Sequence, residues 1–116
     1  MNSGQNEILV QKYFDSLDGN DPSLIRHYFT HDFELILSNA LNLSGKNALD
    51  EYFANHRSVK NSSHELDVTM HENDMSVISG HVTCEIGGKI KEWDFCNFFY
   101  FRGNKISCIK LFTNLS

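Results

Sequence analysis

The second half of the chain repeats its apolar residues at every other position, and this period of two is the strongest constraint on its fold. Alternation is typical of a β-strand whose two faces meet different surroundings. The connections between the alternating segments are short and polar, and Gly87-Gly88 is a dipeptide typical of two-residue hairpin turns. We therefore predict an antiparallel meander of four strands. Their ranges are His64–His71, Met75–Ile86, Lys89–Phe101 and Lys105–Thr113.

The first half has a helical period instead. Apolar residues recur at spacings of three and four over Glu7–Leu17, which predicts a helix that Asp18-Gly19-Asn20 ends. Asp21-Pro22 predicts the cap and first residue of a short second helix reaching about Phe29. Helices kept apart from strands indicate the α+β class, with the helices on one face of a curved sheet. The remaining predicted elements are a strand over Phe33–Ser38, a loop over Asn39–Gly45 and a third helix from Lys46 to about Val59.

Length, charge and cysteine content exclude several functions. The 116 residues suit one domain, spanning 1–116. Ten Lys and Arg against fifteen Asp and Glu give a net charge of −5, and no basic run exists, so we expect no nucleic-acid partner. No apolar run approaches the ~20 residues of a membrane span, and the N-terminus lacks the pattern of a signal peptide. Three cysteines without C-x-x-C spacing predict no zinc site and no disulfide framework, so we expect a cytoplasmic protein without metal or cofactor.

Aromatic residues make up 12% of the chain, more than a small core needs, and they gather on Lys89–Phe101. Both faces of that strand are largely apolar, so neither should be left in water. The helices can cover one face, and a second subunit is the simplest cover for the other. We therefore predict a homodimer through the face of Phe98 and Tyr100; the alternative is a monomer in which both are partly exposed. The first face carries Trp93, Phe95, Asn97, Phe99 and Phe101.

Several stretches resemble one known family. The chain opens with Val10-Gln11-Lys12-Tyr13 and Asp21-Pro22, continues with Tyr28-Phe29-Thr30-His31-Asp32 and Gly45-Lys46, and closes with Trp93-Asp94-Phe95 and Phe101–Ile106. In this order they resemble the SnoaL-like and ketosteroid-isomerase-like domains of the nuclear transport factor 2-like superfamily. The resemblance implies a cone: three N-terminal helices packed against a strongly curved, mainly antiparallel sheet, with an apolar pocket between them.

The resemblance also implies roles for individual residues. Tyr13 stands where the isomerases carry a tyrosine donor, and Asn97 stands where they carry a protonated acid, which an amide N–H could replace. Leu37 stands at the position of the aspartate base, so the isomerase mechanism is not expected. Two donors in a dry site can still bind an oxygen with developing negative charge.

These residues lead to one main functional prediction. We predict a binding pocket for a small, mostly apolar molecule with one oxygen function, because apolar walls with a few polar groups are typical of ligand sites. Plain core packing remains the alternative for each aromatic residue. The predicted lining residues are Tyr13, Phe14, Phe33, Leu35, Leu37, Tyr52, Phe53, Trp93, Phe95, Asn97 and Phe99.

An acid–base enzyme of the isomerase, cyclase or dehydratase type is one alternative, with His81 as the base beside Tyr13. His81 is central in its predicted strand, and the alternation leaves open which sheet face it occupies. Asp94 is expected at the surface or an interface. The other five histidines are expected on solvated surface: His27, His31, His56, His64 and His71.

The sequence lacks the catalytic residues of two enzyme branches of the superfamily. The epoxide-hydrolase branch needs an arginine between two aspartates, whereas Arg26, Arg57 and Arg102 are predicted on helices or a turn. The cyclase branch uses an acidic residue near the final strand, which here offers only Ser107, Lys110 and Thr113. A dimerisation or adaptor module without a ligand is the other alternative, and it predicts a collapsed pocket.

Overall fold

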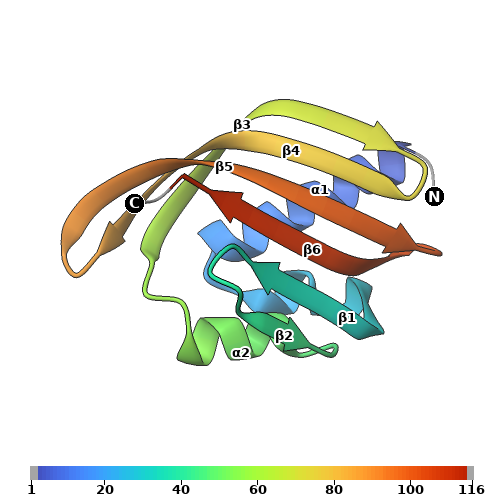
Figure 1. Cartoon of the computed structure of the whole chain (residues 1–116), viewed down its shortest axis with the longest axis horizontal. Helices are drawn as coiled ribbons and strands as arrows, with labels where there is room; N and C mark the ends of the chain where they lie inside the picture. The colour runs from blue at the N-terminus through green and yellow to red at the C-terminus, as the bar shows by residue number, and fades with distance from the viewer. Residues whose placement is uncertain (1–2, 115–116) are drawn as a thin grey trace.

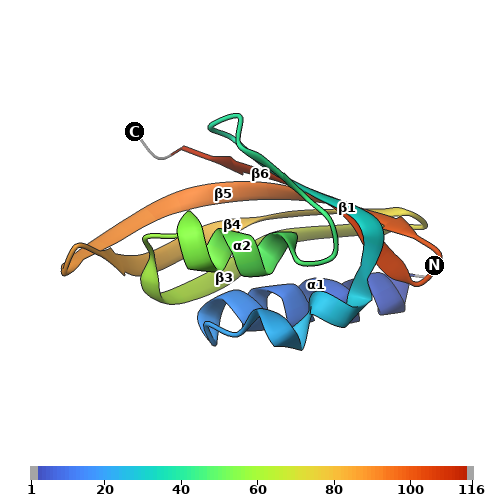
Figure 2. The same cartoon turned by 90° about the horizontal axis from the view of Figure 1, so that it is seen from below.

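Six strands form one curved sheet, and both α-helices lie on the same face of it (Figures 1 and 2). The computed structural model describes residues 3–114. The helical elements are α1 (Ser3–Asp18), the 3₁₀ turns η1 (Pro22–Leu24) and η2 (Arg26–Tyr28), and α2 (Ala48–Asn55). The strands are β1 (Phe29–Leu37), β2 (Asn42–Ser44), β3 (Lys60–Glu72), β4 (Met75–Ile86), β5 (Lys89–Arg102) and β6 (Lys105–Thr113). The α+β class is confirmed.

The predicted meander is also confirmed. The strand order is β2-β1-β6-β5-β4-β3, and the pairs from β3 to β6 are all antiparallel. Gly87 and Gly88 both have positive φ, 59° and 80°, as a two-residue hairpin turn between β4 and β5 requires. β1 then joins β6 in parallel, which brings the N-terminal segment to the end of the meander.

The helical segments differ from the prediction in count and length. The second predicted helix is two 3₁₀ turns, because Ile25 leaves helical geometry at φ −128° and buries its side chain in the core. The third is only Ala48–Asn55, since the carbonyl of Tyr52 accepts the N–H groups of both His56 and Arg57 and closes the helix there. The predicted loop contains the short strand β2, which pairs with β1.

The sheet bends around α1 because β3 is irregular. Its pairing with β4 shifts between Lys60 and Ser63 and again between Leu66 and Val68. At the second shift the strands approach closely: a Cβ on Gly80 would lie 2.1 Å from the carbonyl oxygen of Glu65. Bulges of this kind increase the twist and bend the strand. The curvature carries the start of β3 against the end of α1.

The inner face of the sheet and the apolar stripe of α1 form one core. α1 contributes buried residues at helical spacing, and alternate residues of β4 and β5 meet them. Within the described residues, no helix is long and apolar enough to cross a bilayer. Buried core residues include Val10, Tyr13, Phe14, Leu17, Phe29, Phe33, Leu35, Leu49, Ile78, Phe99, Ile106 and Ile109.

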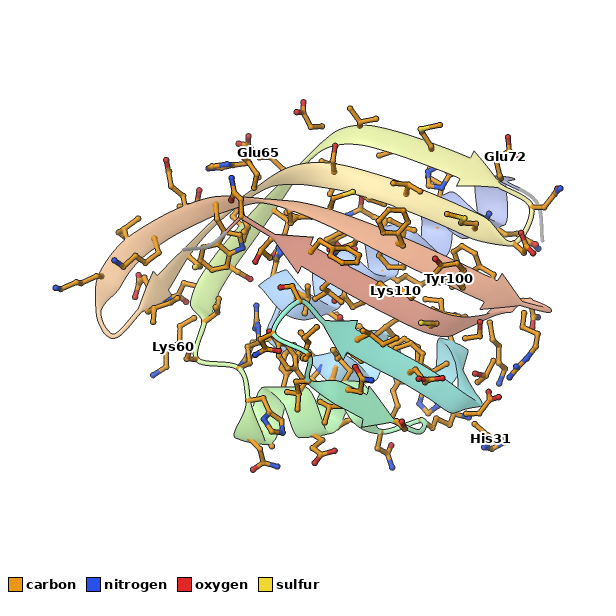
Figure 3. The ribbon with its side chains drawn as sticks, viewed as in Figure 1. His31, Lys60, Glu65, Glu72, Tyr100 and Lys110 are labelled. Carbon is orange, nitrogen blue, oxygen red and sulfur yellow. The ribbon has the colours of Figure 1, made fainter. Side chains whose placement is uncertain are left out.

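Within residues 3–114, no helix or further strand covers the outer face of the sheet (Figures 2 and 3). Phe98 and Phe112 meet edge to face with centroids 5.7 Å apart, and Lys110 lies over the Tyr100 ring at 5.5 Å. Val68 and Met70 on β3 are more than half exposed. This face therefore presents apolar side chains with scattered charges.

Candidate functional site

A cavity of about 80 Å³ lies between α1 and the inner face of the sheet, beside the segment that follows α2. A wider outer chamber of about 360 Å³ lies next to it and shares Tyr52, Val59, Trp93, Leu111 and Thr113 as lining residues. The volume of the outer chamber is within the range of ordinary ligand sites, about 300–1,000 Å³. The inner chamber is also lined by Tyr13, Leu17, Arg57, His64, Val82, Phe95 and Asn97.

Tyr13 and Asn97 bring two buried polar groups to the inner chamber from different elements. Tyr13 is fully buried on α1, and Asn97 is 4% exposed on β5. Among the described residues, neither the Tyr13 hydroxyl nor Oδ1 of Asn97 has a hydrogen-bond partner. An unpaired buried polar group costs about 1–3 kcal/mol. Burial also raises the pKa of the Tyr13 hydroxyl, so it stays protonated and can donate.

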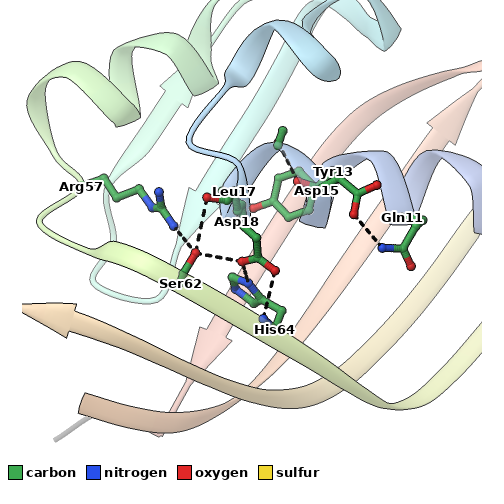
Figure 4. Close-up of polar contacts among 9 residues, drawn as sticks. Gln11, Tyr13, Asp15, Leu17, Asp18, Arg57, Ser62 and His64 are labelled. Atoms are coloured by element: carbon green, nitrogen blue, oxygen red, sulfur yellow. Dashed lines mark hydrogen bonds and ion pairs between the residues drawn. The ribbon is translucent and has the colours of Figure 1, made fainter. Parts of the chain in front are cut away.

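His64 and Asp18 form a hydrogen-bonded pair at the wall of the same chamber (Figure 4). Nδ1 of His64 lies 2.5 Å from Oδ1 of Asp18, and the backbone N–H of His64 donates to Oδ2 at 3.0 Å. The side chain of His64 is 10% exposed and packs against the rings of Phe14 and Phe95. With Nδ1 held by Asp18, Nε2 has no partner among the described residues and is left for a ligand.

The negative charge of Asp18 is stabilised by its hydrogen bonds. Burial by itself would raise the pKa of the Asp18 carboxyl, but hydrogen bonds from His64 and Ser62 outweigh that effect and hold the pKa below its ordinary value. A carboxylate hydrogen-bonded to Nδ1 orients the imidazole ring, so that Nε2 is the ring nitrogen directed away from the pair.

Ser62 links this pair to Arg57 (Figure 4). The Ser62 hydroxyl lies 2.8 Å from Oδ1 of Asp18 and accepts a hydrogen bond from Nη2 of Arg57 at 2.9 Å. The Arg57 guanidinium also lies over the ring of Phe53, 4.8 Å from its centroid. The hydrogen-bonded chain Arg57–Ser62–Asp18–His64 therefore connects two residues that line the chamber, Arg57 and His64.

The predicted lining residues divide between pocket and core. Tyr13, Trp93, Phe95, Asn97 and Tyr52 line the inner chamber, and Leu37 lines the outer one. Phe53 packs against the core and beneath Arg57. The structure places the others wholly inside the core, where they fill the space between helices and sheet: Phe14, Phe33, Leu35 and Phe99.

His81 lies on the outer face of the sheet, opposite the pocket. Its neighbours Gly80 and Val82 face inward, so alternation turns His81 outward. Nδ1 lies 2.9 Å from Asp94, and this hydrogen bond, with Glu92 nearby, raises the pKa of the His81 imidazole. The structure thus separates His81 from Tyr13.

The expectation that His64 is solvated is wrong. β3 begins at Lys60, four residues before the predicted start, so His64 is inside the strand and faces inward with Ser62 and Leu66. The alternation Ser62, His64, Leu66 was the available signal. Asp18 and Arg57 had none, because they read as a helix end and a helix residue until the fold brought them to β3.

A family model described as the SnoaL-like domain matches residues 10–109. The chain belongs to the SnoaL-like family. This confirms the resemblance seen in the sequence. No curated protein matches the chain.

Solved structures share the SnoaL-like fold over nearly the whole chain. An NTF2-like protein from Anabaena variabilis has a TM-score of 0.84 at 16% identity, covering 97% of this chain and 89% of its own. A protein from Jannaschia provisionally named a SnoaL-like polyketide cyclase has 0.83 at 16%, covering 97% and 87%. A protein with a ketosteroid isomerase-like fold from Catenulispora acidiphila, in complex with trimethylamine, has 0.83 at 15%, covering 93% and 86%. Identities this low establish the fold and nothing finer.

Proposed function

We propose that this SnoaL-like protein binds a small, largely apolar molecule that carries an oxygen function. The observation that supports this most is the pair of unpartnered polar groups, on Tyr13 and Asn97, at one apolar chamber. A ligand hydroxyl between them would accept a hydrogen bond from the Tyr13 hydroxyl and donate one to Oδ1 of Asn97. Ligand binding would then offset the free-energy cost of the two buried, unpaired polar groups in the ligand-free protein.

The cavity also favours binding over a ligand-free adaptor role. An adaptor of this family would be expected to fill the space beside Asn97 with side chains. Here a chamber of about 80 Å³ remains beside Asn97, and Trp93 lines it rather than filling it. The Catenulispora relative, which was crystallised with trimethylamine, is a precedent for a small molecule on this fold.

We propose, as a second step, that the pocket catalyses acid–base chemistry through His64. Nε2 of His64 would take a proton from a carbon next to a carbonyl, and Asp18 would stabilise the imidazolium that forms. The Tyr13 hydroxyl would donate to the carbonyl oxygen as its negative charge develops. Return of the proton to another atom gives an isomerisation, and loss of a leaving group gives an elimination.

Proton abstraction can be tested with a simple ketone before the natural substrate is known. We would incubate the protein with 2-decalone in D₂O and follow deuterium entry beside the carbonyl by NMR. The wild type should accelerate exchange, and His64→Gln should lower the protein-catalysed rate by about 10²–10⁴-fold. His81→Gln, on the outer face, is the matched control and should leave the rate unchanged. Equal exchange in wild type and His64→Gln would reject the catalytic step.

We further propose that two copies pair through the outer sheet face. Phe98 and Tyr100 are half-buried there, and Phe112 is 46% exposed beside Phe98. A second copy offers the same apolar face, which suits the self-complementary interface of a two-fold dimer. The pocket opens on the opposite side of the sheet, so pairing would leave it accessible.

A further inference from the structure

Arg57 brings a positive charge to the pocket, and no acidic side chain of the described residues forms an ion pair with it. It lines the inner chamber, and its Nη2 donates to the neutral hydroxyl of Ser62. The ion pairs found among residues 3–114 do not include Arg57, whereas Arg26 and Arg102 each pair with an aspartate. Arg57 therefore differs from the other two arginines in that its charge is available to pair with an anionic ligand.

The rest of the pocket wall carries no acidic side chain among the described residues. Within the described part of the chain, neither chamber is lined by an Asp or a Glu, while His64 and His56 line one chamber each. This is a marked departure from the chain as a whole, in which fifteen acidic residues outnumber ten basic ones. A pocket with the opposite polarity to its protein selects for ligands with negative charge.

The geometry of Arg57 leaves it able to bind an oxyanion. The central carbon of its guanidinium lies over the Phe53 ring, 4.8 Å from the centroid, and this contact helps to hold the group beside the chamber. A guanidinium has five N–H donors, and Ser62 takes one of them. The remaining fork matches the two oxygens of a carboxylate.

The charge also acts on the groups around the chamber. Burial raises the pKa values of Tyr13 and Tyr52, which line the inner chamber, and the positive charge of Arg57 opposes that rise at both. The field of Arg57 therefore reaches the space that a ligand would occupy.

We infer that the ligand is an apolar carboxylic acid, bound as its carboxylate by Arg57 while its hydrocarbon part fills the two chambers. This deepens the function proposed above and rests on it, because it requires the cavity to hold a ligand. It adds a charge preference that Tyr13 and Asn97 alone would not produce, since both can serve a neutral oxygen.

Matched acids and amides test the preference. The probes are cyclohexanecarboxylate and adamantane-1-carboxylate, each paired with its carboxamide. Trp93 is the single tryptophan and lines both chambers, so its fluorescence reports binding. We expect each acid to bind roughly tenfold to a hundredfold more tightly than its amide, the range of a charge-assisted hydrogen bond.

Variants of Arg57 test whether this residue causes the preference for acids over amides. Arg57→Gln should weaken acid binding at least about tenfold and leave amide binding within about twofold, which also shows that the pocket still folds. Arg57→Lys should retain part of the preference, because it keeps the charge and loses the fork. Arg102→Gln is the matched control: it makes the same charge change at the exposed end of β5 and should alter neither affinity.

The outcomes separate the two proposals. Equal affinity for acid and amide in the wild type, or an equal loss of both in Arg57→Gln, would overturn the charge preference while leaving ligand binding established. If neither member of either pair changes Trp93 fluorescence or the melting temperature, ligand binding itself fails, and the preference for an acid fails with it.

Discussion

Nδ1 of His64 lies 2.5 Å from Oδ1 of Asp18, and this contact joins the end of α1 to the start of β3 across 46 residues of sequence. The same carboxylate accepts the backbone N–H of His64. Asp18 therefore hydrogen-bonds both the imidazole ring of His64 and the backbone of β3. The pair is at once a structural clamp and the arrangement that leaves Nε2 free.

Replacing Asp18 with Asn should destabilise the protein in a pH-dependent way. The folded-state pKa of Asp18 is below its ordinary value of 3.8, so its contribution is present above that pH and is lost as the pH falls through the folded pKa. We expect Asp18→Asn to lower the free energy of unfolding by about 1–2 kcal/mol at pH 7. Urea denaturation from pH 7 to pH 3 should show the difference shrinking below about pH 4.

Asp15→Asn is the control for this measurement, because its exposed carboxylate bonds only Gln11 on the same helix. It should change stability by less than about 0.5 kcal/mol. A constant difference for Asp18→Asn across the whole pH range would contradict a role for its charge.

Tyr13→Phe should stabilise the protein and impair binding. The hydroxyl is fully buried and unpartnered among the described residues, so its removal relieves a desolvation cost of about 1 kcal/mol. Thermal melting should show a higher midpoint without ligand. The variant should also bind oxygenated ligands more weakly, with Tyr28→Phe, an exposed ring, unchanged in both respects. A lower melting midpoint for Tyr13→Phe would argue against an unpaired hydroxyl.

Gly80→Ala should be strongly destabilising although it adds one methyl group. The new Cβ would lie 2.1 Å from the Glu65 carbonyl oxygen and 2.9 Å from the Phe95 ring, and backbone cannot move aside as a flexible side chain can. We expect a loss of about 2–3 kcal/mol by urea denaturation. Ser79→Ala, on the outer face of the same strand, should cost much less. A near-neutral Gly80→Ala would mean that the two strands are farther apart.

The outer sheet face should support a dimer that a single charge disrupts. Sedimentation equilibrium should give a dimer mass at micromolar concentration, and Phe112→Glu should give a monomer by placing a charge against the partner's apolar face. Ile8→Glu, on the exposed side of α1, should leave the mass unchanged. A wild-type monomer under these conditions would reject the proposed pairing.

The sequence alone determined the class of fold and half of the site. Period-two alternation and Gly87-Gly88 are local signals, and they predicted the meander correctly. The same alternation put Asn97 among inward-facing rings, and the family resemblance marked Tyr13; the cavity brings the two together. These properties follow from residues close in sequence, or from a family pattern.

Tertiary structure decided the rest. The irregular start of β3 turned His64 inward, and the curvature of the sheet carried it to Asp18. Arg57 reached the chamber because α2 ended early. Nothing within a few residues of Asp18, Arg57 or His64 marks them as partners. Their proximity comes from strand register and helix length, which depend on packing across the whole core.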